Sequence, residues 1–544
     1  MRVSKKRLAA LCLVLLPTVA SVAAAPSAAG QRSAGRSVAG GVAAAAPDLR
    51  LVEAMAGRDT PRVRALLAGD GLDVNAARAD GATALLWAAH WDDGAAAELL
   101  LRAGADVNAA DDHGVTPLAR ASENASASMV ERLLAAGADP NAAQANGLTP
   151  LMTAARTGSL AVVQALLARG ADVDAATAAT HETALMWAVA GRHREVVSTL
   201  VERGADVHPQ PRQAFSPLIA AARNGDLETA EMLLGAGARV DDRGSDGAHP
   251  LAYAVIAGQS AFAHFLLERG ADPDGAVDGV TALHAAAGSV GTWLKAWNRR
   301  HGTRAGRLAL DERLALVDAL LARGADPDAR MTASDVTGQG FVRNGAYDTF
   351  ATGTGDVAGA TPLWVAAYAT NPGPGSSSFR GRRPTPSSNG AILRSLLAAG
   401  ARPDSTPRDG TTALMAAAGC GRAVHLTNVP RAPRVPTAEE AVEILIAAGV
   451  DVNATNEGDF TALHCAAFSG LNEVVRQLVE HSADIDARDW RGRTAFRLAE
   501  GAKQSFHYQE WRGVAALLAE LGADTSLGIP GTIHERLRGF VAAR

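Results

Sequence analysis

The 544-residue sequence has few aromatic residues, few cysteines and almost no lysine. Aromatic residues make up 4% of the chain, there are three cysteines, and four of the 52 basic residues are lysine. With Cys12 near the N-terminus, only two cysteines remain in the body of the chain, and neither they nor the scattered histidines have the spacing of a zinc site. Beyond the N-terminus, no segment is long and apolar enough to span a membrane.

Motifs of common catalytic sites are also incomplete. The segments that begin at His181 and His534 start like the H-E-x-x-H of zinc proteases. Neither has the second histidine, because Leu185 and Arg538 occupy its position. A G-x-G-x-x-A pattern begins at Gly353, but it lies in a loop rather than after a strand, as a dinucleotide site requires. We therefore predict a protein that is not an enzyme and that holds neither a metal nor a cofactor.

The sequence is instead dominated by one repeated pattern. A Thr/Ser/His-Ala/Pro-Leu/Phe tripeptide opens an Ala-rich stretch eleven times, and seven of the ten intervals between copies are 32 to 34 residues. The other three intervals are 80, 51 and 49 residues. A fixed period of this length indicates a solenoid of stacked units. The copies start at Thr83, Thr116, Thr149, Thr183, Ser216, His249, Thr281, Thr361, Thr412, Thr461 and Thr494.

Each copy has the residues of two short antiparallel helices and a loop. In the copy at Thr149, the threonine suits a helix N-cap and Pro150 suits the first helical turn. A second apolar stretch ends in the pair Leu166-Leu167, and Gly170 then supplies a left-handed turn. One such helix pair cannot bury its apolar face alone, so neighbouring units must stack.

The order of these submotifs, a TPLH-type opening, an LL pair and a GADVN-type closing, resembles the ankyrin repeat over roughly residues 48 to 525. The resemblance implies an all-α ankyrin-repeat solenoid of about twelve helix-turn-helix units with loop insertions, in an array over residues 47–527. Leu49 to Asn75 supplies a degenerate first unit. In this family the histidine of the TPLH motif is structural, which applies to His284 and His464. Trp87, Trp187 and Tyr253 stand four residues after a motif start, where they should pack between helices.

The N-terminus resembles a secretory signal peptide. Basic residues precede an apolar run from Leu8 to Leu16, and small residues suited to cleavage follow, which predicts a signal at 1–24 and a flexible linker at 25–46. We expect export, to a periplasm or out of the cell. Loss of the signal's four cations would take the net charge from −5 to −9, and this mild acidity argues against nucleic-acid binding. Residues 528–544 are expected to form a tail or closing cap.

The two remaining cysteines, Cys420 and Cys465, are predicted to be free thiols. An exported pair invites a disulfide, but Cys465 lies four residues after its motif start and Cys420 eight after its own. Four residues of helical rise and one helix layer would separate their Cα atoms by roughly 11 Å, beyond disulfide reach.

Four insertions interrupt the period, near 289–310, 331–357, 369–388 and 419–436. The second lengthens a loop between units, whereas the others fall in the turn between the two helices of three consecutive units. These three contain cations and no Asp or Glu, so they could form one basic edge, with Trp293, Trp297 and Phe379 as apolar anchors; the alternative is a set of solvated loops in an Arg-rich chain. The cations are Lys295, Arg299, Arg300, Arg304, Arg307, Arg380, Arg382, Arg383, Arg422, Arg431 and Arg434.

The resemblance also implies where a partner would bind. The family's variable recognition positions lie seven and eight residues after each motif start and just before it. Here they are occupied by His90, Trp91, Asp112, His113, Glu123, Asn124, Asn146, Arg156, Arg212, Phe215, Arg223, Trp490 and Arg491.

We predict non-catalytic macromolecular recognition, with an unidentified protein bound on the concave surface of the array. Two alternatives stay open. One is binding of an anionic polymer or the cell envelope through the basic edge, and the other is an enzyme or small-ligand site built by the insertions between 289 and 436. An enclosed cleft with convergent polar groups would favour the last.

Overall fold

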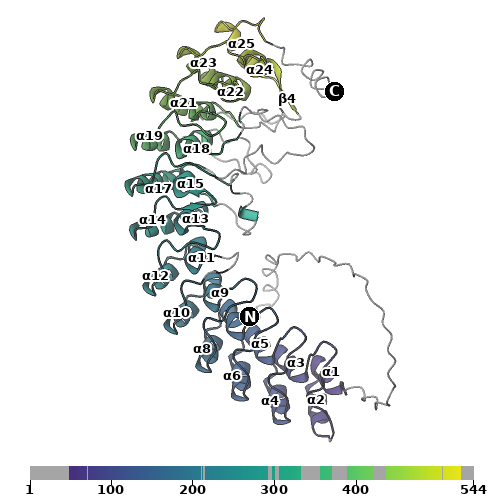
Figure 1. Ribbon diagram of the computed structural model, residues 1–544. Helices are drawn as coiled ribbons and strands as arrows, with labels where there is room; N and C mark the ends of the chain where they lie inside the picture. The colour runs from purple at the N-terminus through teal and green to yellow at the C-terminus, as the bar shows by residue number, and fades with distance from the viewer. Residues whose placement is uncertain are drawn as a thin grey trace, which may run out of the picture.

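The computed structural model describes residues 48–69, 71–209, 211, 215–288, 290–291, 294, 297–299, 306–332, 354, 356–370, 389–421, 437–504 and 507–528. These residues form twelve helix pairs stacked in sequence order into a curved array, which confirms the all-α solenoid (Figure 1). The first helix of each pair lies on the concave side and the second on the convex side. The predicted signal peptide and linker lie outside the described residues, as does all but the first residue of the predicted C-terminal tail.

The helix bounds follow the repeat. The first helices are α1 (Arg50–Ala56), α3 (Ala84–His90), α5 (Pro117–Glu123), α7 (Pro150–Thr157), α9 (Ala184–Gly191), α11 (Pro217–Asn224), α13 (Pro250–Ile256), α15 (Ala282–Ala287), α18 (Pro362–Ala369), α20 (Ala413–Ala417), α22 (Ala462–Ser469) and α24 (Ala495–Gly501). The second helices are α2 (Thr60–Leu67), α4 (Gly94–Arg102), α6 (Ala127–Ala135), α8 (Leu160–Ala168), α10 (Arg194–Glu202), α12 (Leu227–Gly235), α14 (Ser260–Glu268), α17 (Leu310–Ala322), α19 (Gly390–Ala398), α21 (Thr437–Ala447), α23 (Asn472–Glu480) and α25 (Arg512–Glu520).

Two short antiparallel hairpins are the only strands among the described residues. Strands β1 (Ala276–Val277) and β2 (Val280–Thr281) pair Ala276 with Thr281 just before α15. Strands β3 (Ala502–Gln504) and β4 (His507–Gln509) lie between the helices of the last unit. No described helix combines the length and apolar character needed to cross a bilayer.

Local sequence explains where the helices begin. The Thr149 hydroxyl accepts a hydrogen bond from the Met152 N–H at 3.3 Å, and Pro150 occupies the first turn, where a missing N–H costs nothing. The same cap recurs at Thr83, Thr116 and Thr361. An N-cap of this type contributes about 1 kcal/mol to the stability of a helix. The repeated threonine therefore sets the start of the first helix in most units.

The core runs along the whole array rather than through one centre. Buried residues from Leu51 to Ala523 form one continuous cluster. Alanines dominate the first helices, and their small side chains let neighbouring helices approach closely. Leucine and valine side chains of the second helices cover this layer from the convex side. Each unit thus buries its apolar face only by stacking on its neighbours.

Side chains of the loop that ends each unit bond to the next unit. The Asn141 amide donates to the Gly170 carbonyl at 3.0 Å and its oxygen accepts from the Asp172 N–H at 2.7 Å. Asn75, Asn108 and Asn453 make the same pair of bonds. Aspartate at this position retains only the accepting bond, as Asp174 does from the Asp206 N–H at 2.8 Å. We call this series of contacts the loop ladder.

Asn141→Ala should lower the free energy of unfolding by about 1 to 2 kcal/mol, because two hydrogen bonds between units are lost. Chemical denaturation followed by circular dichroism would measure the change. Gln164→Ala is the matched control, since Gln164 is an exposed residue of α8 in the next unit. Equal stability of the two variants would contradict a stabilising role for the ladder.

Candidate recognition surface

The first helices of the six N-terminal units lie on the concave side, and each keeps residues that are partly or fully exposed, whereas every residue of α13, α15, α20 and α22 is buried (Figure 1). In α3, Trp87 and His90 are partly exposed, whereas Leu85, Leu86 and Ala88 are buried. The two exposed positions lie four and seven residues after the motif start, so they share one side of the helix. The structure therefore places a row of exposed side chains along the concave surface of the six N-terminal units, one short segment per unit.

The predicted recognition residues divide by exposure. Asp112, His113, Glu123, Asn124, Asn146 and Arg156 are exposed, as is Trp490 with 48% of its surface accessible. His90, Trp91, Phe215, Arg223 and Arg491 are partly buried, and Arg212 lies outside the described residues. Asn124 also has a structural role, because its amide donates to the Ala89 and His90 carbonyls of the preceding unit at 2.9 Å each.

An aromatic cluster occupies the N-terminal end of this surface. The rings of Trp87 and Trp91 stack with centroids 6.0 Å apart, and His90 lies edge-on to Trp91 at 4.5 Å. Two guanidinium groups cover the pair, with Arg58 5.0 Å from the centre of Trp91 and Arg78 5.9 Å from that of Trp87. Because Trp87 lies four residues after a motif start, the sequence predicts that it packs between helices. This prediction is only partly correct, since part of the Trp87 side chain is exposed.

The indole N–H groups of both tryptophans are buried and have no hydrogen-bond acceptor among the described residues. A buried donor without an acceptor costs about 1 to 3 kcal/mol. The cluster is therefore a less stable part of the array than its buried core.

Trp297, in the first turn insertion, lies against residues of earlier units. Trp297 is 2% exposed, and its ring packs 6.1 Å from Phe215 and 5.4 Å from Tyr253, both of earlier units. Its indole N–H donates to the Asp246 carboxylate at 2.7 Å. The expectation that Trp297 is an apolar anchor for a partner is wrong, because the array itself buries the ring. Phe215, a predicted recognition residue, is among the residues that cover it.

A second contact attaches this insertion to the array shortly before α17 begins. The Gly306 N–H donates to the Ile256 carbonyl at 2.8 Å. A Cβ atom on Gly306 would lie 2.0 Å from the Ala257 carbonyl oxygen, so only glycine fits this contact. The insertion is thus attached to the unit that precedes its own.

The predicted basic edge is described at only two residues. Arg299 and Arg307 are exposed, and the other nine cations of the edge lie outside the described residues. In chain order the inserted ranges fall between α15 and α17, α17 and α18, α18 and α19, and α20 and α21.

The histidines of the TPLH motif are structural. His284 is fully buried, with Nδ1 2.8 Å from the Thr281 hydroxyl and Nε2 3.0 Å from the Ala360 carbonyl of the next unit. A neutral ring with its proton on Nε2 satisfies both contacts. Burial lowers the pKa of His284 to about 4 and lowers the pKa of His464, which bonds the Arg493 carbonyl in the same way.

Stability should therefore fall as the pH drops from 6.5 towards 4. In this interval the unfolded chain takes up a proton at His284 and the folded chain does not, which costs about 1.4 kcal/mol per pH unit. Urea unfolding of the wild type and of His284→Gln at pH 7 and pH 5 would test this. The variant should be less stable at pH 7 but should lose less stability on acidification. His113→Gln, at an exposed site, should keep the wild-type pH dependence.

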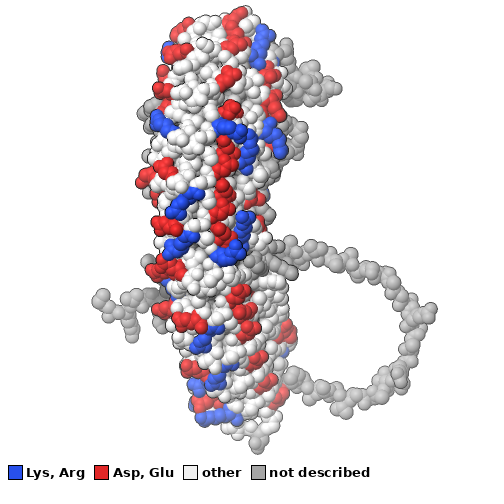
Figure 2. Space-filling model, turned by 60° about the vertical axis from the view of Figure 1, so that its left-hand side comes forward, with Lys and Arg blue, Asp and Glu red and all other residues white. Residues whose placement is uncertain are grey.

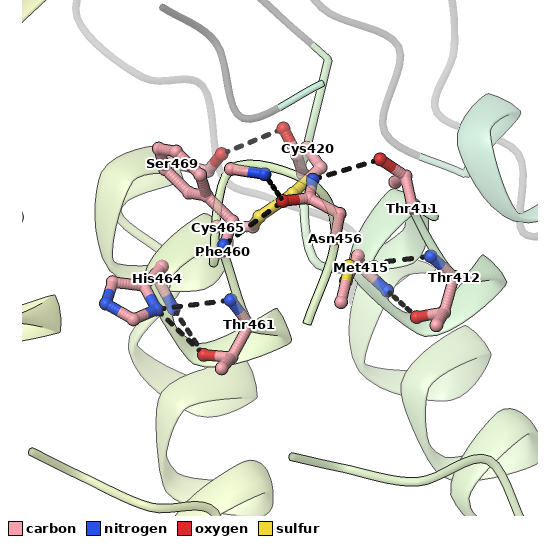
Figure 3. Close-up of a disulfide and its surroundings, with 12 residues drawn as sticks. Thr411, Thr412, Met415, Cys420, Asn456, Phe460, Thr461, His464, Cys465 and Ser469 are labelled. Atoms are coloured by element: carbon pink, nitrogen blue, oxygen red, sulfur yellow. Dashed lines mark hydrogen bonds between the residues drawn. A yellow bond between two sulfur atoms is a disulfide. The ribbon is translucent and has the colours of Figure 1, made fainter. Parts of the chain in front are cut away.

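The cysteine prediction is wrong, because Cys420 and Cys465 form a disulfide with their Cα atoms 5.0 Å apart (Figure 3). Helix α20 has five residues and ends at Ala417, so Cys420 does not continue a helical rise. The chain turns at Gly419, where φ is 109°, and the Cys420 N–H returns to the Met415 carbonyl. This turn brings Cys420 against α22 of the next unit.

Reduction should destabilise the units that the disulfide links. A loop of 45 residues between bonded cysteines corresponds to about 4 kcal/mol in the chain-entropy treatment. Thermal melts with and without dithiothreitol should differ for the wild type. A Cys420→Ala/Cys465→Ala variant should melt lower and show no response to the reductant. Free thiols in peptide maps of the unreduced protein would contradict the bond.

One open depression of about 380 Å³ lies beside the start of α10, lined by Gly158, Arg192, His193, Arg194, Glu195 and Val196. Within the described part of the chain, no three His, Cys, Asp or Glu side chains are grouped to hold a metal ion.

A family model described as ankyrin repeats in three copies matches residues 51–144, 121–211, 218–331 and 435–525. The chain belongs to the ankyrin-repeat family. The matched residues cover both ends of the array, and the stacked helix pairs agree with them. An ankyrin-repeat array is a framework for recognition, and ankyrin repeats generally mediate contacts between proteins.

Similar proteins share only the repeats. A serine/threonine-protein kinase 12 of Arabidopsis thaliana is 42% identical over 57 residues, which are 10% of this chain and 12% of the kinase. An ankyrin repeat and KH domain-containing protein mask-1 of Caenorhabditis elegans is 36% identical over 99 residues, 18% of this chain and 4% of that protein. This ankyrin-repeat chain thus matches a small part of either relative's length.

Among solved structures, the human ASB11 ankyrin repeat domain is 30% identical, with a TM-score of 0.36. The match covers 41% of this chain and 98% of the ASB11 domain.

Proposed function

We propose that this ankyrin-repeat protein is exported and binds a partner protein, without catalysis, through the concave surface of its N-terminal six units. The observation that carries the proposal is the row of exposed side chains on the first helices, such as Glu123 and Arg156. A rigid array holds these side chains at fixed spacing, so a partner can contact several units without ordering a loop.

Export is supported by two independent features. The first 24 residues have the pattern of a cleavable signal, and a buried disulfide joins Cys420 and Cys465. Disulfides form and persist in oxidising compartments and are rare in the cytosol. A periplasm or the cell exterior fits both features.

Photo-crosslinking tests which surface binds. A photoreactive phenylalanine analogue replaces Arg156 on the concave side or Gln164 on the convex side of the same unit, in the full-length protein mixed with native extract. We expect discrete protein adducts at position 156 and none at position 164. Equal adducts at both positions, or adducts only from a probe at Arg307, would contradict binding by the concave surface.

A further inference from the structure

Five arginines along the N-terminal half of the concave side and its turns have no acidic partner. Among described residues, no carboxylate lies within ion-pair distance of them, although other arginines of the array are paired, for example Arg194 with Asp226 at 2.8 Å and Arg120 with Glu123 at 2.8 Å. The five, here called the arginine strip, are Arg58, Arg78, Arg156, Arg192 and Arg223.

Three of the five arginines of the strip stand over aromatic rings. Arg58 and Arg78 stand over Trp91 and Trp87, and Arg223 stands 5.7 Å from the centre of Phe215. Stacking on a ring fixes the plane of a guanidinium while its N–H groups stay available to an incoming carboxylate. A cation without a carboxylate, held on an aromatic face and exposed at its edge, is suited to an acidic ligand.

Many carboxylates of the array lie outside the arginine strip, although Asp112 and Glu123 stand among the exposed side chains of the recognition surface. Aspartates recur in the loop ladder from unit to unit, at Asp106, Asp139, Asp172, Asp206 and Asp272. Figure 2 shows Asp and Glu side chains in a line that follows the long axis of the array. Lys and Arg side chains lie beside this line on the same face, so attraction of an acidic partner depends on the guanidinium groups of the arginine strip themselves.

One contact ends the available surface, and the spacing of the units sets the length of ligand that each unit can bind. At its far end, Trp297 covers Phe215 and Tyr253, so the strip is closed beyond the sixth unit. Stacked helices are about 8 to 10 Å apart, and an extended peptide rises about 3.3 Å per residue. One unit therefore corresponds to about three residues of an extended ligand.

We propose that the arginine strip binds an extended segment of a partner protein that carries Asp or Glu at about every third residue. The inference rests on the proposed function, which supplies the concave side as the binding surface, and adds the chemistry of the partner. Guanidinium groups on either side of α2 and at the ends of α7, α9 and α11 would meet carboxylates of the ligand, with none at the α5 unit, where Arg120 pairs with Glu123. The Trp87–Trp91 stack would contact the apolar atoms between the carboxylates.

Arginine in the last turn of a helix also complements the helix dipole. This explanation applies to Arg156 and Arg223, which lie in last turns, but not to Arg58 and Arg78, which lie outside helices. It predicts effects on stability alone.

The probe is a fluorescein-labelled 18-residue peptide, (Gly-Thr-Glu)6, measured by fluorescence anisotropy with the full-length protein at low and high salt. Its controls are (Gly-Thr-Lys)6 and a peptide of the same composition with all glutamates consecutive. We expect salt-sensitive binding of the periodic acidic peptide, with at least tenfold weaker binding of the basic one and several-fold weaker binding of the clustered one.

Arg58→Glu/Arg156→Glu/Arg223→Glu should weaken binding at least tenfold. Arg62→Glu/Arg64→Glu/Arg203→Glu, which changes the net charge equally at two exposed positions of α2 and at the exposed residue that follows α10, should stay within twofold of wild type. Thermal melts verify folding, and the single variant Arg156→Gln, expected to weaken binding about threefold, replaces the triple variant if that one does not fold.

Equal loss in both triple variants, or equal binding of the periodic and clustered peptides, would overturn the inference. Tight binding of heparin that depends on the arginine strip, without binding of the acidic peptide, would also overturn it in favour of an anionic polymer. If the acidic peptide does not bind while crosslinks still form at position 156, the proposed chemistry of the partner is wrong and the concave binding surface is retained. If the peptide binds but no protein crosslinks at position 156, the proposed function fails.

Discussion

The structure depends on burial of apolar surface between neighbouring units. No helix pair has enough apolar contact within itself, and the continuous cluster from Leu51 to Ala523 forms only because each pair lies on the next. Small alanines on the first helices allow this close approach. The first helices are buried where they contact neighbouring helices, so in the six N-terminal units only their concave side remains for recognition. The position of the candidate site therefore follows from the packing.

Polar contacts between units fix the stacking register. The loop ladder bonds neighbouring units at most closing loops, and His284 reaches the Ala360 carbonyl although 76 residues separate them in sequence. The insertions therefore lengthen the chain without interrupting the stack. This tolerance is expected where each unit contacts only its neighbours, because an added turn at the edge disturbs no enclosed core.

The insertions and the disulfide divide an otherwise uniform array. Trp297 covers the concave surface near Phe215 and Tyr253, and Cys420 joins Cys465 further along. The exposed surface before Trp297 carries arginines and tryptophans, whereas the loop ladder carries aspartates. A repeat fold thus obtains distinct binding properties from a few residues at its variable positions, while the repeated residues maintain the framework.

The repeat could be predicted from the amino-acid sequence. Threonine caps, paired leucines and closing glycines recur at a fixed period, so stacked helix pairs follow from local chemistry, whereas the structural role of His284 and His464 follows from the resemblance to ankyrin repeats. Tertiary structure alone decided the disulfide and the burial of Trp297, because both depend on where a non-repeating segment leaves its helix. The chain beyond the short helix α20 turns Cys420 towards the next unit, and Trp297 and Gly306 of the first insertion contact units that precede their own. No period constrains such paths, and they are set by contacts between residues distant in sequence.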